Sequence, residues 1–272
     1  MAIRMIVTDM DGTLLSPTNC IPEANKAVLQ EAAARGIRVA IATGRMHRSA
    51  LPFAEEIAVA APIISCNGAL VKTVAGEEMF SSCIAPEVVR AVLDFMKEHG
   101  WYVQLYTDDR LLFVEYDKRA CSYEKGAGVQ GEAVGWDGLY AKRARVHKLL
   151  SMTAGGEETD ARAAELSERF RGQATAVRSK ERYIDIMAPG VSKAASIERL
   201  AKSFGIEMAE VLALGDSDND SEMLQAAGIG VAMTTGTKAA KRAADFLAEN
   251  EAADGVARAV RAYAFGEKQG QG

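Results

Sequence analysis

Residues 9–15, Asp9-Met10-Asp11-Gly12-Thr13-Leu14-Leu15, place two carboxylates directly after an apolar run, Met5-Ile6-Val7, that is predicted to form a short buried strand. Asp-Gly is common in turns, so this stretch by itself fits a turn as well as a functional site. Acids crowded at the end of a strand repel one another and lose hydration, which favours holding a hard cation, attacking a substrate, or both. A second acidic cluster, Gly215-Asp216-Ser217-Asp218-Asn219-Asp220, also follows an apolar run and adds weight to the functional interpretation.

The chain around these clusters alternates between strands and helices. Over residues 3–67 the predicted strands are 3–8, 37–42 and 63–66, and the predicted helices are 23–35 and 46–57. After Pro189-Gly190 the pattern returns, with strands 211–214 and 229–232 and a helix over 192–204. These strands are apolar throughout, which is typical of parallel strands buried on both faces. The sequence therefore predicts an α/β fold with a Rossmann-like, doubly wound parallel sheet.

The middle of the chain has a different pattern. Hairpin-like alternation begins near Leu70, followed by a predicted helix over 87–99 and a predicted hairpin over 101–115. Both tryptophans lie in this middle part. We predict that residues 83–187 form an α+β domain inserted into the first one, so that the first domain, the core, consists of residues 1–82 and 188–272.

Composition excludes several classes of protein. The chain has 272 residues, 49% hydrophobic and 25% charged, and a net charge of −5, so it carries no overall positive field that would attract nucleic acid or an anionic membrane. It has no apolar stretch long enough to span a bilayer and no signal-type segment, which favours a cytoplasmic protein. The cysteines are scattered singly, without a Cys-x-x-Cys pair, so neither a zinc site nor a disulfide framework is predicted.

In an open parallel sheet, ligands bind beyond the carboxyl ends of the strands, so residues just after each predicted strand should converge. Those residues, together with a lysine at the start of a predicted helix, are Asp9, Asp11, Thr43, Gly44, Arg45, Asn67, Asp216, Asn219, Asp220 and Lys193. Carboxylates suit Mg²⁺, whereas a threonine hydroxyl, bare glycine amides and a lysine suit phosphate oxygens. The set therefore indicates a site for a phosphate group and a magnesium ion.

These residues fall in four motifs that resemble those of the haloacid dehalogenase superfamily of phosphatases, in the Cof-like branch with a type IIB cap. The motifs are DMDGTL from Asp9, ATGR containing Thr43, GVSKA containing Lys193, and GDSDND from Gly215. The core–insert–core layout extends the resemblance over essentially the whole chain. One departure is Ala194 after the lysine, where the family often has glycine.

The resemblance implies a role for each residue. Asp9 would be the nucleophile that forms an aspartyl-phosphate, and Asp11 would protonate the leaving alcohol and then activate water. Mg²⁺ would be held by the Asp9 carboxylate, the Asp11 backbone carbonyl and Asp216, with Asp220 reaching it through water. Thr43, Gly44, Lys193 and Asn219 would bind the phosphoryl group. We expect Asp9 to stay ionised and Asp11 to hold a proton, since their environments differ.

The predicted function is the Mg²⁺-dependent hydrolysis of a small phosphomonoester, such as a sugar phosphate or related metabolite, with the insert as a substrate lid. One alternative is a phosphotransferase of the phosphomannomutase kind. Another is a non-enzymatic, phospho-accepting metal-binding module, against which the insert and Lys193 argue. Leaving-group contacts are expected at Arg45, Asn67, Arg178 and Tyr183, and no protein partner can be inferred.

Three further patterns have ordinary structural interpretations. Residues 216–220 imitate a calcium loop but lack its glycine and final glutamate. Residues 126–131 match GxGxxG by spacing, yet they follow a polar stretch and are predicted to form a loop. A basic run, Lys142, Arg143, Arg145 and Lys148, is predicted to be a solvated face, with a role in binding a substrate anion as the alternative.

Overall fold

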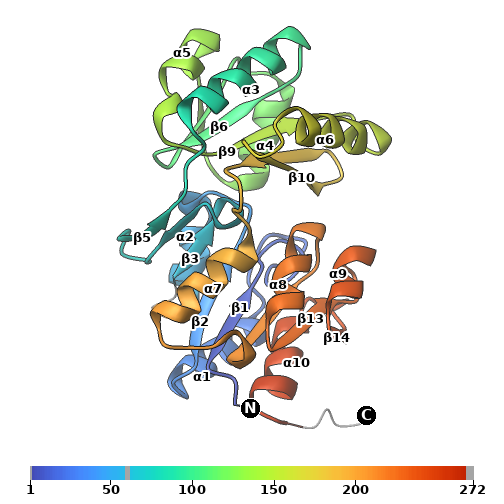
Figure 1. Cartoon of the computed structure of the whole chain (residues 1–272). Helices are drawn as coiled ribbons and strands as arrows, with labels where there is room; N and C mark the ends of the chain where they lie inside the picture. The colour runs from blue at the N-terminus through green and yellow to red at the C-terminus, as the bar shows by residue number, and fades with distance from the viewer. Residues whose placement is uncertain (1, 59–61, 268–272) are drawn as a thin grey trace.

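The structure, a computed structural model, describes residues 2–58 and 62–267 and contains two β-sheets, each with its own helices, stacked one above the other (Figure 1). The larger sheet has eight strands in the order β14-β13-β12-β1-β2-β3-β4-β5, and the smaller has six in the order β10-β11-β9-β6-β7-β8. In the described part of the chain, no helix is long and apolar enough to cross a membrane.

The larger sheet is parallel from β14 to β3, and β4 and β5 extend it with two antiparallel strands. Its strands are β1 (Met5–Thr8), β2 (Arg38–Ala42), β3 (Ile63–Ser65), β4 (Leu70–Lys72), β5 (Glu78–Ser81), β12 (Val211–Gly215), β13 (Ile229–Met233) and β14 (Phe246–Ala248). Strand β1 lies between β2 and β12, so the chain runs outward from β1 in both directions. The predicted doubly wound fold is confirmed, and this switch point is where such folds bind ligands.

Helices cover both faces of this sheet, which explains its continuously apolar strands. On one face, Ile6 and Leu212 pack with α1 (Glu23–Ala34), α2 (His47–Ile57) and α10 (Gly255–Ala259). On the other, Met5 and Val7 pack with α7 (Lys193–Ser203), α8 (Ser221–Ala226) and α9 (Lys238–Ala243). Successive residues of β1 point to opposite faces of the sheet, as in any strand. All four are buried because helices cover both faces.

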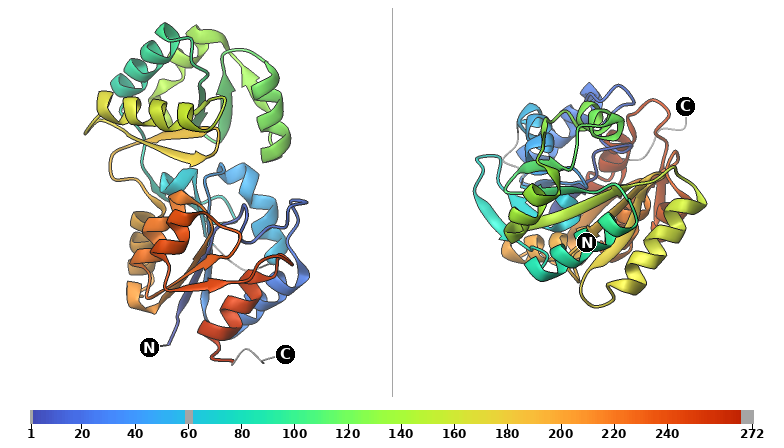
Figure 2. Two further views of the ribbon diagram at one scale, coloured as in Figure 1. Left: turned by 90° about the vertical axis from the view of Figure 1, so that its right-hand side faces the viewer. Right: turned by 90° about the horizontal axis from the view of Figure 1, so that it is seen from above.

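The smaller sheet belongs to the middle of the chain. Its strands are β6 (Gln104–Thr107), β7 (Arg110–Phe113), β8 (Gly131–Ala133), β9 (Val146–Met152), β10 (Thr175–Lys180) and β11 (Tyr183–Met187). Helices α3 (Pro86–Glu98), α5 (Gly135–Ala141) and α6 (Glu157–Arg169) pack on one face. On the other face α4 (Lys118–Ala127) and the core residues Met46 and Cys66 complete a shared hydrophobic cluster, so this face is turned toward the core (Figure 2).

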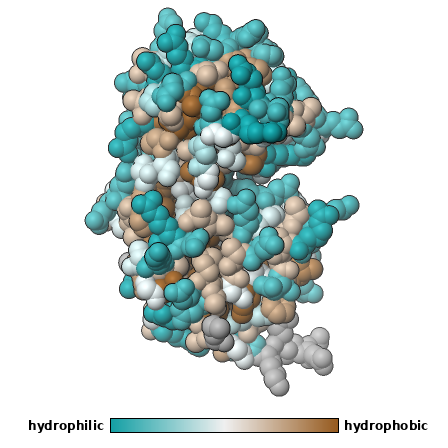
Figure 3. Space-filling model, viewed as in Figure 1, coloured by the Kyte–Doolittle hydropathy of each residue, from teal (hydrophilic) through white to brown (hydrophobic). Residues whose placement is uncertain are grey.

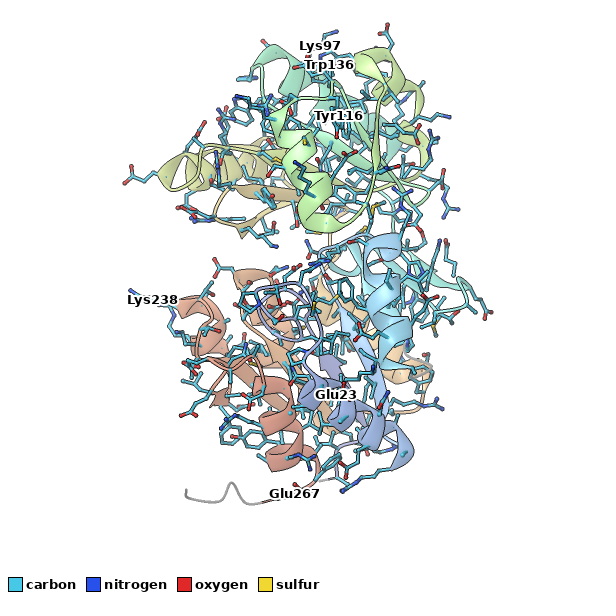
Figure 4. The ribbon with its side chains drawn as sticks, turned by 180° about the vertical axis from the view of Figure 1, so that it is seen from behind. Glu23, Lys97, Tyr116, Trp136, Lys238 and Glu267 are labelled. Atoms are coloured by element: carbon cyan, nitrogen blue, oxygen red, sulfur yellow. The ribbon has the colours of Figure 1, made fainter. Side chains whose placement is uncertain are left out.

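The chain crosses between the two sheets twice. Strand β5 is the last strand of the larger sheet before the crossing, and the chain returns after β11 ends at Met187. The predicted boundaries at residues 83 and 187 fall at these crossings, and the division into two domains stays a prediction. The surface is hollowed between the two parts (Figure 3). Trp136 lies at the end of the insert farthest from the core, and the Lys97 ammonium is 5.7 Å from the centre of its ring (Figure 4).

The structure differs from the sequence-based prediction at two places, the GxGxxG-like segment and the basic run. The GxGxxG-like segment is only partly a loop, because Gly126 and Ala127 form the end of α4 and Gly128 ends that helix with a φ of 65°. Within the basic run, the prediction of a solvated face is wrong for Lys148, whose side chain is only 2% exposed on β9. Side chains alternate along a strand, so Lys148 shares the core-facing side with Leu150 and Met152.

Candidate active site

Carboxylates from β1 and β12 meet a buried lysine at the carboxyl edge of the larger sheet. Asp9 follows β1, Asp220 lies in the turn after β12, and Lys193 is the first residue of α7. The ammonium of Lys193 lies 2.5 Å from Asp9 Oδ1 and 2.6 Å from Asp220 Oδ1. All three residues are buried, so their charges interact with little screening by water.

Local backbone features hold this cluster together. Gly12 has a φ of 86°, and a Cβ there would lie 2.5 Å from Asp216 Oδ2, so only glycine fits the turn after the first acidic motif. Ser192 caps α7 by accepting a hydrogen bond from the Ala195 amide. The helix therefore starts at Lys193 with a proper cap, and Ala194 leaves that start intact.

Three carboxylates form a group whose chemistry fits a hard cation. Ligand oxygens of Asp9, Asp216 and Asp220 lie within 4.8 Å of one another. The hydroxyls of Thr13 and Ser217 donate to Asp216, at 2.9 and 3.0 Å, and so orient its two oxygens. One lysine faces these three acids, and a divalent cation with oxygen ligands would balance the excess negative charge.

Burial raises the pKa of two of these acids, Asp216 and Asp9. Burial, and next the charge of Asp220, raise the pKa of Asp216 to about 6. Burial also raises the pKa of Asp9 well above its usual value, because Lys193 does not outweigh burial and the neighbouring carboxylates. The acid cluster is thus unfavourably charged at neutral pH without a cation.

We therefore expect the Asp216 carboxyl to lower the stability of the metal-free protein as the pH rises from about 4 to 6. A carboxyl whose folded-state pKa is raised stabilises the fold only while it is protonated, so the Asp216 contribution is lost as pH rises through about 6. This pH-dependent loss of unfolding free energy should be on the order of 2 kcal/mol, and it should be absent from Asp216→Asn. Urea unfolding in EDTA at pH 4 to 7 measures it, and parallel pH profiles of wild type and variant would contradict the expectation.

Asp11 has a different environment from the one predicted. Arg45 donates two hydrogen bonds to its carboxylate, from Nε at 3.0 Å and from Nη2 at 2.6 Å, and the Lys180 ammonium lies 3.7 Å away. Burial opposes ionisation of Asp11, but Arg45 and Lys180 outweigh it and lower the pKa. Without a metal, burial raises the pKa of Asp9 while Arg45 lowers that of Asp11, so these shifts oppose the expected order of protonation, which assumed a metal ion at Asp9.

The predicted phosphoryl-binding residues lie at the same edge of the sheet. Thr43 follows β2, and its Oγ1 accepts a hydrogen bond of 3.1 Å from the Arg45 amide. A Cβ on Gly44 would lie 2.9 Å from Asn67 Oδ1, so glycine allows this close approach. Asn219 donates to the same Asn67 oxygen at 2.9 Å.

A cavity of about 130 Å³ opens beside these residues and is lined from both parts of the chain. The core contributes Asp9, Asp11, Gly44, Arg45, Ser217 and Asn219. The insert contributes Tyr123, Gly126, Ala127, Lys148, Leu150, Ser179, Lys180, Tyr183 and Asp185. A cavity of this size next to acids, amides and lysines suits a small polar molecule.

Of the four residues expected to contact the leaving group, two line this cavity. Tyr183 and Arg45 do so, and Arg45 is paired with Asp11. Asn67 is 2% exposed and is not among the lining residues of this cavity, but it lines a neighbouring pocket. Arg178 is not among the lining residues and pairs with Asp160 at 2.8 Å instead.

Sequence reasoning missed Asp185 and Tyr123 and assigned Lys148 to the surface. A signal existed for two of them, since Lys148 and Asp185 are single charges inside apolar strands, Val146–Met152 and Tyr183–Met187. Such charges are almost never fully buried unless they are paired.

The fold and site together define a phosphatase of the haloacid dehalogenase type. The sequence model of haloacid dehalogenase-like hydrolases matches residues 6–260, and the chain belongs to that family. The chain is 26% identical over 260 residues to 5-amino-6-(5-phospho-D-ribitylamino)uracil phosphatase YcsE of Bacillus subtilis, with 95% of each chain covered. It is similar in fold to the subclass IIB sugar phosphatase BT4131, with a TM-score of 0.83 and 24% identity, covering 96% of this chain and 98% of that one. The expected Cof-like assignment is confirmed.

A longer protein also matches. The chain is 30% identical over 273 residues to the chloroplastic endoribonuclease YBEY of Arabidopsis thaliana, which covers 96% of this chain. This chain spans only 46% of the length of that relative. The ribonuclease name therefore describes a protein more than twice as long.

Proposed function

We propose that this phosphatase hydrolyses a small phosphomonoester, such as a sugar phosphate, in a Mg²⁺-dependent reaction through an aspartyl-phosphate on Asp9. The observation that carries the proposal is the buried Asp9–Lys193–Asp220 cluster beside a cavity lined from both parts of the chain. The B. subtilis relative is named for a small phosphorylated metabolite, which supports a substrate of that size.

Each side chain takes a role that its position allows. Asp9 would attack phosphorus, with Lys193 next to it to balance charge on the phosphoryl oxygens. Thr43, Gly44 and Asn219 would bind those oxygens at the same edge of the sheet. Asp9, Asp216 and Asp220, with the backbone carbonyl of Asp11, would hold Mg²⁺, which supplies Lewis-acid stabilisation of phosphoryl charge when bound.

Asp11 would act as the general acid and base. Its side chain lines the cavity, where a leaving oxygen would lie. Because Arg45 lowers the pKa of Asp11, the acid step requires Arg45 to release the carboxyl when substrate binds. In its ionised form, paired as in this structure, Asp11 is suited to accept a proton from water.

The insert would act as the substrate lid. It provides Tyr123, Tyr183 and Lys180 to the cavity, so a bound leaving group would lie between the two sheets. Enclosure would exclude bulk water and strengthen the electrostatic interactions around the phosphoryl group. Arg45 and Tyr183 line this cavity and are the leaving-group contacts that we propose, whereas Asn67 and Arg178 line a neighbouring pocket with Lys193 and Asn219 and stay predictions.

Removal of divalent cations tests the metal requirement. We expect EDTA treatment to lower phosphate release from phosphorylated metabolites by at least about 100-fold and added Mg²⁺ to restore it, because the metal stabilises the transition state by several kcal/mol. The measurement is free phosphate across a screen of sugar and related phosphates, with and without Mg²⁺. Full activity in EDTA would contradict the metal requirement, and isomerised product without phosphate release would favour a phosphotransferase.

A further inference from the structure

Two buried charges of the insert reach into the core beside the proposed phosphoryl site. Lys148 on β9 and Asp185 on β11 are both 2% exposed, and the Lys148 ammonium lies 3.3 Å from Asp185 Oδ1. Both side chains line the cavity. The two strands are neighbours in the smaller sheet, so the ion pair is built on rigid secondary structure.

Each member of this pair makes a hydrogen bond to the core. Lys148 Nζ donates to the backbone carbonyl of Gly44 at 2.6 Å. Asp185 Oδ2 accepts from Asn67 Nδ2 at 2.6 Å. Asn67 in turn accepts from Asn219 Nδ2 at 2.9 Å. The ion pair thus contacts Gly44 directly and Asn219 through one residue, and both are proposed to bind the phosphoryl group.

Lys148 has little capacity left for a substrate. Its ammonium contacts the Gly44 carbonyl and the Asp185 carboxylate, and it also lies 4.4 Å from the centre of the Tyr106 ring. Asp185 Oδ2 is occupied by Asn67, and Oδ1 is buried against the lysine without a hydrogen bond. Because the Lys148 ammonium makes two polar contacts to the protein and Asp185 Oδ2 binds Asn67, the geometry favours a role in orienting other residues over direct contact with a leaving group.

We propose that Lys148 and Asp185 are positioning residues, which fix Gly44 and Asn219 in the geometry that binds a phosphoryl group. This inference rests on the proposed function. Because the pair belongs to the insert and its partners belong to the core, the phosphoryl site is complete only when the insert is docked. Docking of the lid is thereby coupled to assembly of the site on which the chemistry depends.

A buried ion pair seldom adds stability over an apolar pair of similar size, because the cost of desolvating both charges offsets their attraction. Its hydrogen bonds, in contrast, set directions, which apolar side chains do not. The contacts to Gly44 and Asn67 are therefore the part of this arrangement that apolar replacements would lose.

The test compares Lys148→Met and the uncharged pair Lys148→Met/Asp185→Asn with wild type. The probes are p-nitrophenyl phosphate and the best substrate of the phosphate-release screen, and inorganic phosphate as inhibitor. We expect kcat/KM to fall by about 100-fold, since small misplacements of binding groups have effects of this size. The loss should be of similar size for both substrates, and inhibition by inorganic phosphate should weaken, because the lost contacts concern the phosphoryl group.

Lys142→Met is the matched control, because Lys142 is exposed on the same insert and should leave kinetics unchanged. Unequal losses for the two substrates with unchanged inhibition by phosphate would overturn the proposal and indicate leaving-group contact. Full activity in the folded double variant would overturn it as well, since the hydrogen bond from Lys148 is absent there. If wild type releases no phosphate from any substrate, the proposed function itself fails.

Discussion

Asp9→Asn is expected to lower kcat for phosphate release by at least about 10⁴-fold, in keeping with the loss seen when a nucleophile is removed from an enzyme. An amide does not form the aspartyl-phosphate. Among the described residues, the other carboxylate bound to Lys193 is that of Asp220, which does not replace Asp9 because it is fully buried and accepts hydrogen bonds from two backbone amides. Single-turnover assays with acid quench and intact-mass measurement check this, since wild type should show a phosphorylated adduct and the variant none.

The matched control is Asp218→Asn. Asp218 belongs to the second acidic motif, with Asp216 and Asp220, but is exposed, and its replacement should change kcat less than about twofold, as surface changes usually do. Undiminished phosphate release by a folded Asp9→Asn protein would refute the nucleophile assignment. A phosphorylated adduct on the variant would place the nucleophile elsewhere in the chain.

The strand-end acids were predictable because the rule that identifies them is topological. Asp9 and Asp216 follow continuously apolar strands, and parallel neighbours such as β1 and β12 end at the same edge of a sheet. Local sequence patterns therefore predicted that acids far apart in the chain lie close together in the fold. The identification of Lys193 needed the family motif, since a lysine at a helix start is usually solvated.

Side-chain pairing was not predictable to the same degree. Arg45 and Asp11 are 34 residues apart, and nothing in the sequence decides whether that arginine binds a substrate or a carboxylate of its own chain. The burial of Lys148 and Asp185 was harder still to predict, because it follows from which face of the smaller sheet packs on the core. Strand periodicity predicts which side chains share one face of the sheet, but what packs on that face depends on the tertiary arrangement.

Lys193→Met is expected to reduce both activity and stability. The lysine is 1% exposed and bridges Asp9 and Asp220, so methionine keeps the volume but leaves two buried carboxylates without a counter-charge. Removing one partner of a buried ion pair typically costs about 3–5 kcal/mol, so the free energy of unfolding at pH 7 in EDTA should fall by that amount. Phosphate release should fall by at least about 10³-fold, because phosphoryl charge loses its nearest cation.

The pH dependence separates this effect from a simple packing defect. The Asp9 and Asp220 carboxylates raise the pKa of Lys193 despite the opposing effect of burial, so its stabilising contribution is present throughout neutral pH and is lost only at strongly alkaline pH. In the variant, protonation of Asp9 relieves the unpaired charge, so the loss of unfolding free energy should be smaller at pH 5 than at pH 8.

Lys202→Met, which replaces an exposed lysine on the same helix, should change the free energy of unfolding by no more than about 0.5 kcal/mol. Added Mg²⁺ should raise the Tm of Lys193→Met more than that of wild type, and equal shifts would contradict a shortage of positive charge among these carboxylates.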